Sequence, residues 1–103
     1  MAVVVVATIV PKPEHREEVL AAFTAAVEAV HAEPGCELYA LHQAPDRLVM
    51  IEQWADGDTL RTHGRGEALQ RLGQAIDGKL DAPLEVLTFS PVPAGDPGKG
   101  TLR

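Results

Sequence analysis

The chain of 103 residues has a hydrophobic fraction of 46%, which suits one globular domain with a core of its own. Nine basic and fifteen acidic residues give a net charge of -6, and this charge repels phosphate backbones and anionic lipid headgroups. Neither nucleic acid nor a membrane is therefore an expected partner. We expect a cytoplasmic protein, because the apolar residues 2–10 lack the basic start of a signal peptide.

The single cysteine, Cys36, excludes an internal disulfide and leaves the Cys/His spacing of a zinc site unmet. We expect its side chain to pack as a small hydrophobe. No glycine-rich phosphate-binding loop follows a predicted strand. The sequence accordingly predicts that no metal or flavin cofactor is needed.

Residues 2–10 form a continuous β-branched apolar run, the pattern of a central strand that is buried on both faces. Residues 14–32 then predict an amphipathic helix, because apolar side chains recur at steps of three and four: Val19, Leu20, Phe23, Val27 and Val30. Pro34 and Gly35 end this helix, and a second strand follows over residues 36–43.

The short link at residues 44–47 predicts a hairpin, which makes the second strand and the third, residues 48–54, antiparallel neighbours. Alternation along the third strand divides its side chains into two sets: Leu48, Met50, Glu52 and Trp54 on one face, and Val49, Ile51 and Gln53 on the other. Both faces are apolar in the first half of this strand, so both must be covered.

Asp56 is a good N-cap for a short helix that carries Leu60 and His63. A second apolar stripe continues after two glycines, and we therefore predict one helix that is broken near Gly64 and carries Leu69, Leu72, Ile76 and Leu80. Residues 84–89 then form a fourth strand.

The element order β-α-β-β-α-β predicts an α+β, ferredoxin-like domain, in which a four-stranded antiparallel sheet has its helices on one face. We assign residues 1–91 to this domain and the Pro- and Gly-rich residues 92–103 to a C-terminal tail. Because helices cover only one face, a second copy of the sheet is the simplest cover for the other. The sequence thus predicts a homodimer whose sheets meet through Val3, Val5, Ala7, Ile9, Val49 and Ile51.

Several of these features occur together in one known family: a valine-rich first strand, Glu33-Pro34-Gly35-Cys36 leading to Tyr39, Ile51-Glu52-Gln53-Trp54, and His63 downstream. From about residue 3 to residue 89 the chain resembles the antibiotic biosynthesis monooxygenase (ABM) family of small dimeric α+β barrel proteins. Members of that family oxidise quinols and polycyclic phenols without metal or flavin, others degrade haem, and many have no known activity. The resemblance implies a fold and a list of reactions.

Two positions distinguish this chain from the haem-degrading branch. The resemblance implies that such enzymes place an asparagine on the first strand and a histidine iron ligand about ten residues past His63, where this chain has Thr8 and Gly73. Haem degradation is accordingly disfavoured. The cofactor-free reaction needs less from the protein, because a deprotonated, electron-rich phenol can itself reduce dioxygen. The enzyme then supplies a base and a dry pocket.

Three residues are the candidate catalytic groups. His63 is the natural base, because an unperturbed imidazole titrates near pH ~6.5 and accepts a phenolic proton at neutral pH. Trp54 would pack against an aromatic substrate and donate a hydrogen bond from its indole N–H. Glu52, on the same strand face, would orient the imidazole. Each also has a structural interpretation: a helix histidine bonded to the sheet, a core tryptophan, and a solvated strand end.

Tyr39, Phe23 and Met50 are the candidate substrate-binding residues. Tyr39 would reach the same cavity and hydrogen-bond a quinone oxygen, although a half-buried strand tyrosine needs no function to explain it. Phe23 and Met50 would line such a pocket. His42 has the opposite strand parity to Tyr39, so we expect it to face the dimer side.

Two hypotheses of different classes follow. The first is a cofactor-independent monooxygenase that oxidises a quinol or polycyclic phenol to a quinone with dioxygen, with His63 as base. The second is a non-catalytic dimeric protein that binds a small molecule or acts as an accessory protein, in which the same residues fill the core. An open cavity bordered by His63, Trp54 and Tyr39 would favour the enzyme.

Overall fold

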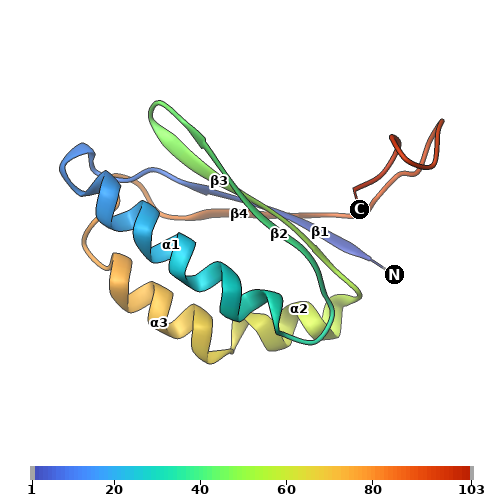
Figure 1. The fold of residues 1–103 in the computed structure, drawn as a ribbon, viewed down its shortest axis with the longest axis horizontal. Helices are drawn as coiled ribbons and strands as arrows, with labels where there is room; N and C mark the ends of the chain where they lie inside the picture. Colours follow the sequence, from blue (N-terminus) through green and yellow to red (C-terminus); the bar gives the residue numbers. More distant parts are fainter. Residues whose placement is uncertain (1, 103) are drawn as a thin grey trace.

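The structure, a computed structural model, describes residues 2–102. Its elements in chain order are β1 (Val3–Ile9), a 3-10 turn η1 (Pro13–His15), α1 (Arg16–His31), β2 (Cys36–Ala44), β3 (Arg47–Trp54), α2 (Gly57–Gly64), α3 (Glu67–Ile76) and β4 (Glu85–Phe89). The strands form one antiparallel sheet in the order β2-β3-β1-β4. Figure 1 shows the helices together on one side of this sheet, so the predicted α+β, ferredoxin-like fold is confirmed.

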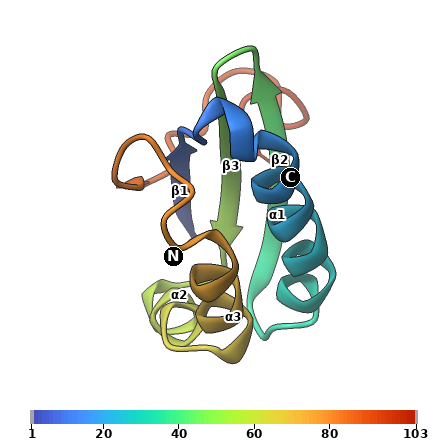
Figure 2. The same ribbon diagram turned by 90° about the vertical axis from the view of Figure 1, so that its left-hand side faces the viewer.

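The continuously apolar β1 lies at the centre of the sheet, as expected, with β3 beside it. Turned by 90°, Figure 2 shows α1 running along β2 and β3, with α2 and α3 beside it. The helix-facing side of the central strands holds the largest fully buried side chains of the sheet: Trp54, Ile9, Leu48, Met50 and Val5. α1 completes this core with its buried Val19, Phe23 and Val30.

The helix that we predicted to be broken near Gly64 is divided into α2 and α3 by Arg65 and Gly66. Asp56 and Thr59 form a reciprocal capping box that starts α2. α3 ends at Ile76, so Leu80 lies beyond the helix in which we expected it. Gly78, at φ +75°, reverses the chain, and Leu80 instead forms an isolated antiparallel bridge with Pro11.

The predicted dimer face is wrong for β1. Val5 and Ile9 are 1% and 0% exposed on the helix side of the sheet, and Ala7 is buried with them. The register decides this, because Val5 pairs with Glu52 and residues paired across an antiparallel ladder point to the same face. A continuous apolar run has no polar face of its own, so its sequence did not distinguish the two sides.

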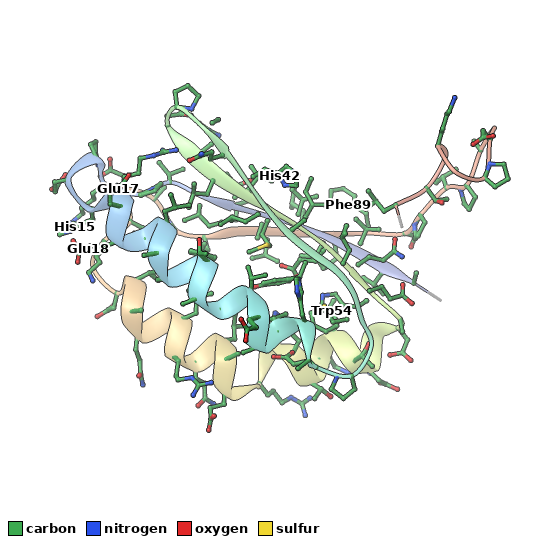
Figure 3. All side chains as sticks on the ribbon, in the orientation of Figure 1. His15, Glu17, Glu18, His42, Trp54 and Phe89 are labelled. Carbon is green, nitrogen blue, oxygen red and sulfur yellow. The ribbon has the colours of Figure 1, made fainter. Side chains whose placement is uncertain are left out.

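The outer face of the sheet, away from the helices, is apolar and partly exposed. β1 and β3 contribute Val4, Val6, Val49 and Ile51 to this face. β4 adds Leu87 and Phe89, and these two side chains are about half exposed. Figure 3 shows His42 on this side and Trp54 on the helix side, as strand parity predicted. No helix of the described chain covers this face.

Residues 92–102, the described part of the predicted tail, contain no helix or strand, and Val92 is 83% exposed. Figure 1 shows this segment leading away from the sheet. Met1 and Arg103, the ends of the proposed domain and tail, lie outside the described residues. Within residues 2–102, no helix has both the length and the hydropathy that a membrane span requires.

Candidate active site

A cavity of about 370 Å³ lies between the helix-facing side of the sheet and the helices. This volume falls in the range of small-molecule sites. Most of its lining is apolar: Val5, Ala7, Phe23, Met50, Leu60, Leu69, Leu72, Ile76, Leu84 and Val86, with two glycines. The polar lining consists of Tyr39, Glu52, His63 and Thr88. Leu84 and Val86 are 45% and 57% exposed, so the cavity reaches the surface beside β4.

His63 lies in the last turn of α2 and is only 5% exposed. Its ring stacks on Trp54 at a centroid distance of 4.5 Å and 29° between planes, and it meets Tyr39 edge-on at 5.5 Å. Nδ1 lies 2.9 Å from the Glu33 carboxylate. A carboxylate partner favours the tautomer with its proton on Nδ1, which leaves the Nε2 lone pair free to accept a proton.

Nε2 of His63 faces accessible space. Within residues 2–102 it forms no hydrogen bond, yet every fully buried side-chain nitrogen or oxygen there has a partner. An unpartnered atom of this buried ring is therefore not fully enclosed. His63 lines the cavity and also a second pocket beside Glu33; Nδ1 is the nitrogen on the Glu33 side, which leaves Nε2 for the cavity. The arrangement can take a proton from a ligand in an apolar environment.

Trp54 does not line the cavity. It is fully buried behind the imidazole, and its indole N–H donates to Glu52 Oε1 at 2.9 Å, not to the cavity. Burial raises the pKa of the Glu52 carboxyl, and the bond from Trp54 opposes that rise only in part. Trp54 thus supports the His63 ring from behind and orients Glu52, whose side chain does reach the cavity.

The hydrogen bond that we expected Glu52 to make with His63 is made by Glu33 instead. Glu33 follows α1, and Pro34 and Gly35 turn the chain so that it lies against α2. Gly35 has φ +79°, a Cβ there would clash with the Thr59 side chain, and its carbonyl accepts from the Ala55 N–H at 2.8 Å. This close contact brings the Glu33 carboxylate to the imidazole.

The sequence contained one clue to Glu33. It is the first residue of the Glu33-Pro34-Gly35-Cys36 run, but no spacing rule joins it to a histidine 30 positions away. Cys36 itself is half-buried against the core, and burial raises the pKa of its thiol. It packs as the small hydrophobe that we expected.

The three predicted substrate-binding residues all line the cavity. Phe23 and Met50 are buried at 4% and 1% exposure and contribute apolar surface. Tyr39 is buried too, and burial, with the nearby carboxylates Glu52 and Glu33, strongly raises the pKa of its phenol. Its hydroxyl therefore stays protonated and can donate a hydrogen bond at neutral pH. The roles of these residues remain predictions.

Residues 2–102 contain no group of three or more His, Cys, Asp or Glu side chains placed to hold a metal ion. Thr8, at the first position that differs from the haem-degrading branch, pairs with Val49 and points to the outer face of the sheet. Gly73, at the second, lines the cavity without a side chain. The expectation that no cofactor is needed remains a prediction.

The fold and the site define a small α+β protein with an imidazole at the wall of an apolar cavity. Residues 2–75 match the family described as antibiotic biosynthesis monooxygenase. The chain is 33% identical over 81 residues to the probable quinol monooxygenase YgiN of Escherichia coli K12, which covers 68% of this chain and 78% of that protein. The chain therefore belongs to the antibiotic biosynthesis monooxygenase family.

Solved structures agree with this assignment. The structure of PA3566 from Pseudomonas aeruginosa matches with a TM-score of 0.79 and 30% identity, over 85% of this chain and 91% of that one. The structure of Rv0793 from Mycobacterium tuberculosis, at 23% identity, has a TM-score of 0.86 over 93% of this chain and 100% of that one, and it supports the fold. Family and relatives together support monooxygenase chemistry as the general class of activity.

Proposed function

We propose that this protein is a cofactor-independent monooxygenase that oxidises a quinol or a polycyclic phenol to a quinone with dioxygen. One observation carries the proposal: His63 has one ring nitrogen bonded to the Glu33 carboxylate and the other free at the wall of an apolar cavity of about 370 Å³. The relative named as a probable quinol monooxygenase supports the same substrate class.

In the proposed reaction, His63 Nε2 takes the phenolic proton, and the phenolate then transfers an electron to dioxygen. For a phenol, one oxygen atom enters the ring and the other leaves as water, so phenol plus dioxygen yields quinone plus water. A quinol reacting in the same way yields a hydroxyquinone plus water. The proton held on His63 is returned to the reduced oxygen. An apolar wall suits this chemistry, because excluding water strengthens the electrostatic interactions inside the site.

Glu33 acts on the reaction through His63 and is a positioning residue. A carboxylate on Nδ1 holds the imidazole in the required tautomer and stabilises the imidazolium that forms after proton transfer. Tyr39 donates a hydrogen bond to a substrate oxygen, and Phe23 and Met50 pack against the substrate rings. Glu52 presents its second carboxyl oxygen to the same cavity, while Trp54 fixes the positions of both Glu52 and His63.

A homodimer is part of the proposal. The outer sheet face carries Val4, Val6, Val49, Ile51 and Phe89, and a monomer would leave this apolar surface in water. A second copy packed on the same face forms a closed two-fold pair. A stable interface of this kind buries at least about 1,200 Å² in total. The cytoplasmic location expected from the sequence stays a prediction, which cell fractionation would check.

The test is oxygen consumption by metal-stripped protein against a panel of quinols, naphthols and fused-ring phenols. We expect oxygen uptake with at least one of them, quinone formation by absorbance, and no gain when metals or flavin are added. His42→Ala is the matched control, because His42 lies on the outer face. Tight binding of the same compounds without oxygen uptake would favour the alternative of a non-catalytic binding protein, which the same cavity would serve.

A further inference from the structure

The polar side chains that the sheet contributes to the cavity lie in one row across the strands. Tyr39 on β2 pairs with Glu52 on β3, Glu52 pairs with Val5 on β1, and Val5 pairs with Thr88 on β4. All four line the cavity. This polar row, Tyr39–Glu52–Val5–Thr88, therefore presents a hydroxyl, a carboxyl and a second hydroxyl along one line, interrupted only by Val5.

The next row on the same face is apolar throughout its cavity-lining part. Met50, Ala7 and Val86 are paired in the same way, and each lines the cavity. Alternate residues of a strand lie about 7 Å apart, so the two rows are parallel stripes separated by roughly the width of a fused aromatic ring system. The helices add apolar side chains and one polar group, His63, whose ring stands 5.5 Å from Tyr39. The base is thus at the β2 end of the polar row.

Each polar member of the row has an atom available to a ligand. Within residues 2–102, the hydroxyls of Tyr39 and Thr88 form no hydrogen bond, and Glu52 accepts through one oxygen, from Trp54. Fully buried side-chain nitrogens and oxygens in this part of the chain all have partners. The free oxygens of the buried Tyr39 and Glu52 must therefore border accessible space, which is the cavity that they line.

We propose that the cavity selects fused-ring phenols whose oxygens all lie along one long edge, and that the Thr88 hydroxyl hydrogen-bonds the oxygen at the open end of the cavity, beside β4. That edge lies on the polar row, with the phenol to be ionised beside His63, and the hydrocarbon edge lies on Met50, Ala7 and Val86. Neighbouring strands are about 4.8 Å apart, so Glu52 and Thr88 are roughly 10 Å apart, a span that several fused rings fill.

The selectivity follows from the cost of burying a hydroxyl without a partner. An oxygen on the wrong edge would face the apolar row. Over the buried Met50 and Ala7 it would lose its hydrogen bonds to water without replacement, whereas beside the exposed Val86 it would lose only part of them. A one-ring quinol, whose two oxygens point in opposite directions, can place only one of them on the polar row. The substrate class of the proposed monooxygenase is thereby narrowed. Turnover rests on that proposed function, whereas the binding preference rests on the two rows alone.

The test compares two isomers of equal size and composition, 1,8- and 1,5-dihydroxyanthracene, by fluorescence titration of the full chain. In the first, both hydroxyls lie on one long edge; in the second, they lie on opposite edges. We expect the 1,8 isomer to bind severalfold more tightly, the scale of one additional hydrogen bond, to Thr88. Equal binding, tighter binding of the 1,5 isomer, or no binding of either would overturn the proposal.

Two variants on β4 locate the effect. Thr88→Val removes the hydroxyl and keeps the shape, and it should weaken binding of the 1,8 isomer severalfold. Val86→Thr adds a hydroxyl to the apolar row and should instead improve binding of the 1,5 isomer. Unchanged affinities in both variants would show that the polar row does not determine which isomer binds. Oxygen uptake is measured separately: a clear isomer preference without oxygen uptake would leave this inference standing and refute the monooxygenase.

Discussion

Replacing His63 by alanine is expected to produce two separate losses. The first is catalytic, because removing a positioned general base lowers turnover by roughly 10²-fold or more. The second is structural, because the ring is buried between Trp54 and Tyr39. Aromatic contacts contribute about 0.5–1.5 kcal/mol each, so losing both costs roughly 1–3 kcal/mol. For a domain of this size that corresponds to a fall in Tm of about 5–20 °C.

The assay must separate these losses. Oxygen uptake is measured well below the Tm of the variant, and thermal unfolding is followed by circular dichroism. Added imidazole should partly restore turnover in His63→Ala, because the vacated space adjoins the cavity, and it should not accelerate the wild type. His42→Ala, on the outer face away from the cavity, should retain activity. If His63→Ala turned over substrate as fast as His42→Ala, His63 would be structural and its role as the base would be refuted.

Four further outcomes are expected. Glu33→Gln should lower kcat about tenfold with little change in KM, because a neutral partner stabilises the imidazolium less. Glu37→Gln is the control for steady-state kinetics, because it neutralises a carboxylate that is bonded to Gln53. Ile51→Glu should split the dimer or unfold the chain, since an unpaired buried charge costs roughly 3–5 kcal/mol; wild type that sediments as a stable monomer at micromolar concentration would contradict this. Burial raises the pKa of Glu52 above its unfolded value, so the charged carboxylate destabilises the fold above the folded pKa. This penalty fades as pH falls toward 4.5. Glu52→Gln should therefore have a higher Tm than wild type at neutral pH, and the difference in Tm should shrink in acid. Protein purified without additives should contain no stoichiometric iron, zinc or flavin by elemental analysis and absorbance.

The fold could be predicted from sequence because its signals are local. Strand alternation, the three- and four-residue apolar spacing of α1, the Asp56 cap and the short link between β2 and β3 each depend on residues close together in the chain. Their order then restricts the topology to a ferredoxin-like sheet with helices on one face. The sequence also singled out His63, Glu52 and Tyr39, which the structure places at one cavity, while their roles remain predictions.

Only the tertiary structure decided which side of β1 faces the helices and which carboxylate meets His63. An all-apolar strand has no preferred face until it pairs, and pairing with β3 assigned Val5 and Ala7 to the cavity. Glu33 reaches the imidazole from 30 positions away because the turn at Gly35 packs against α2. That turn, and the cross-strand row that brings Tyr39, Glu52 and Thr88 into line, depend on contacts between distant segments, and the sequence encodes these only through the folded chain.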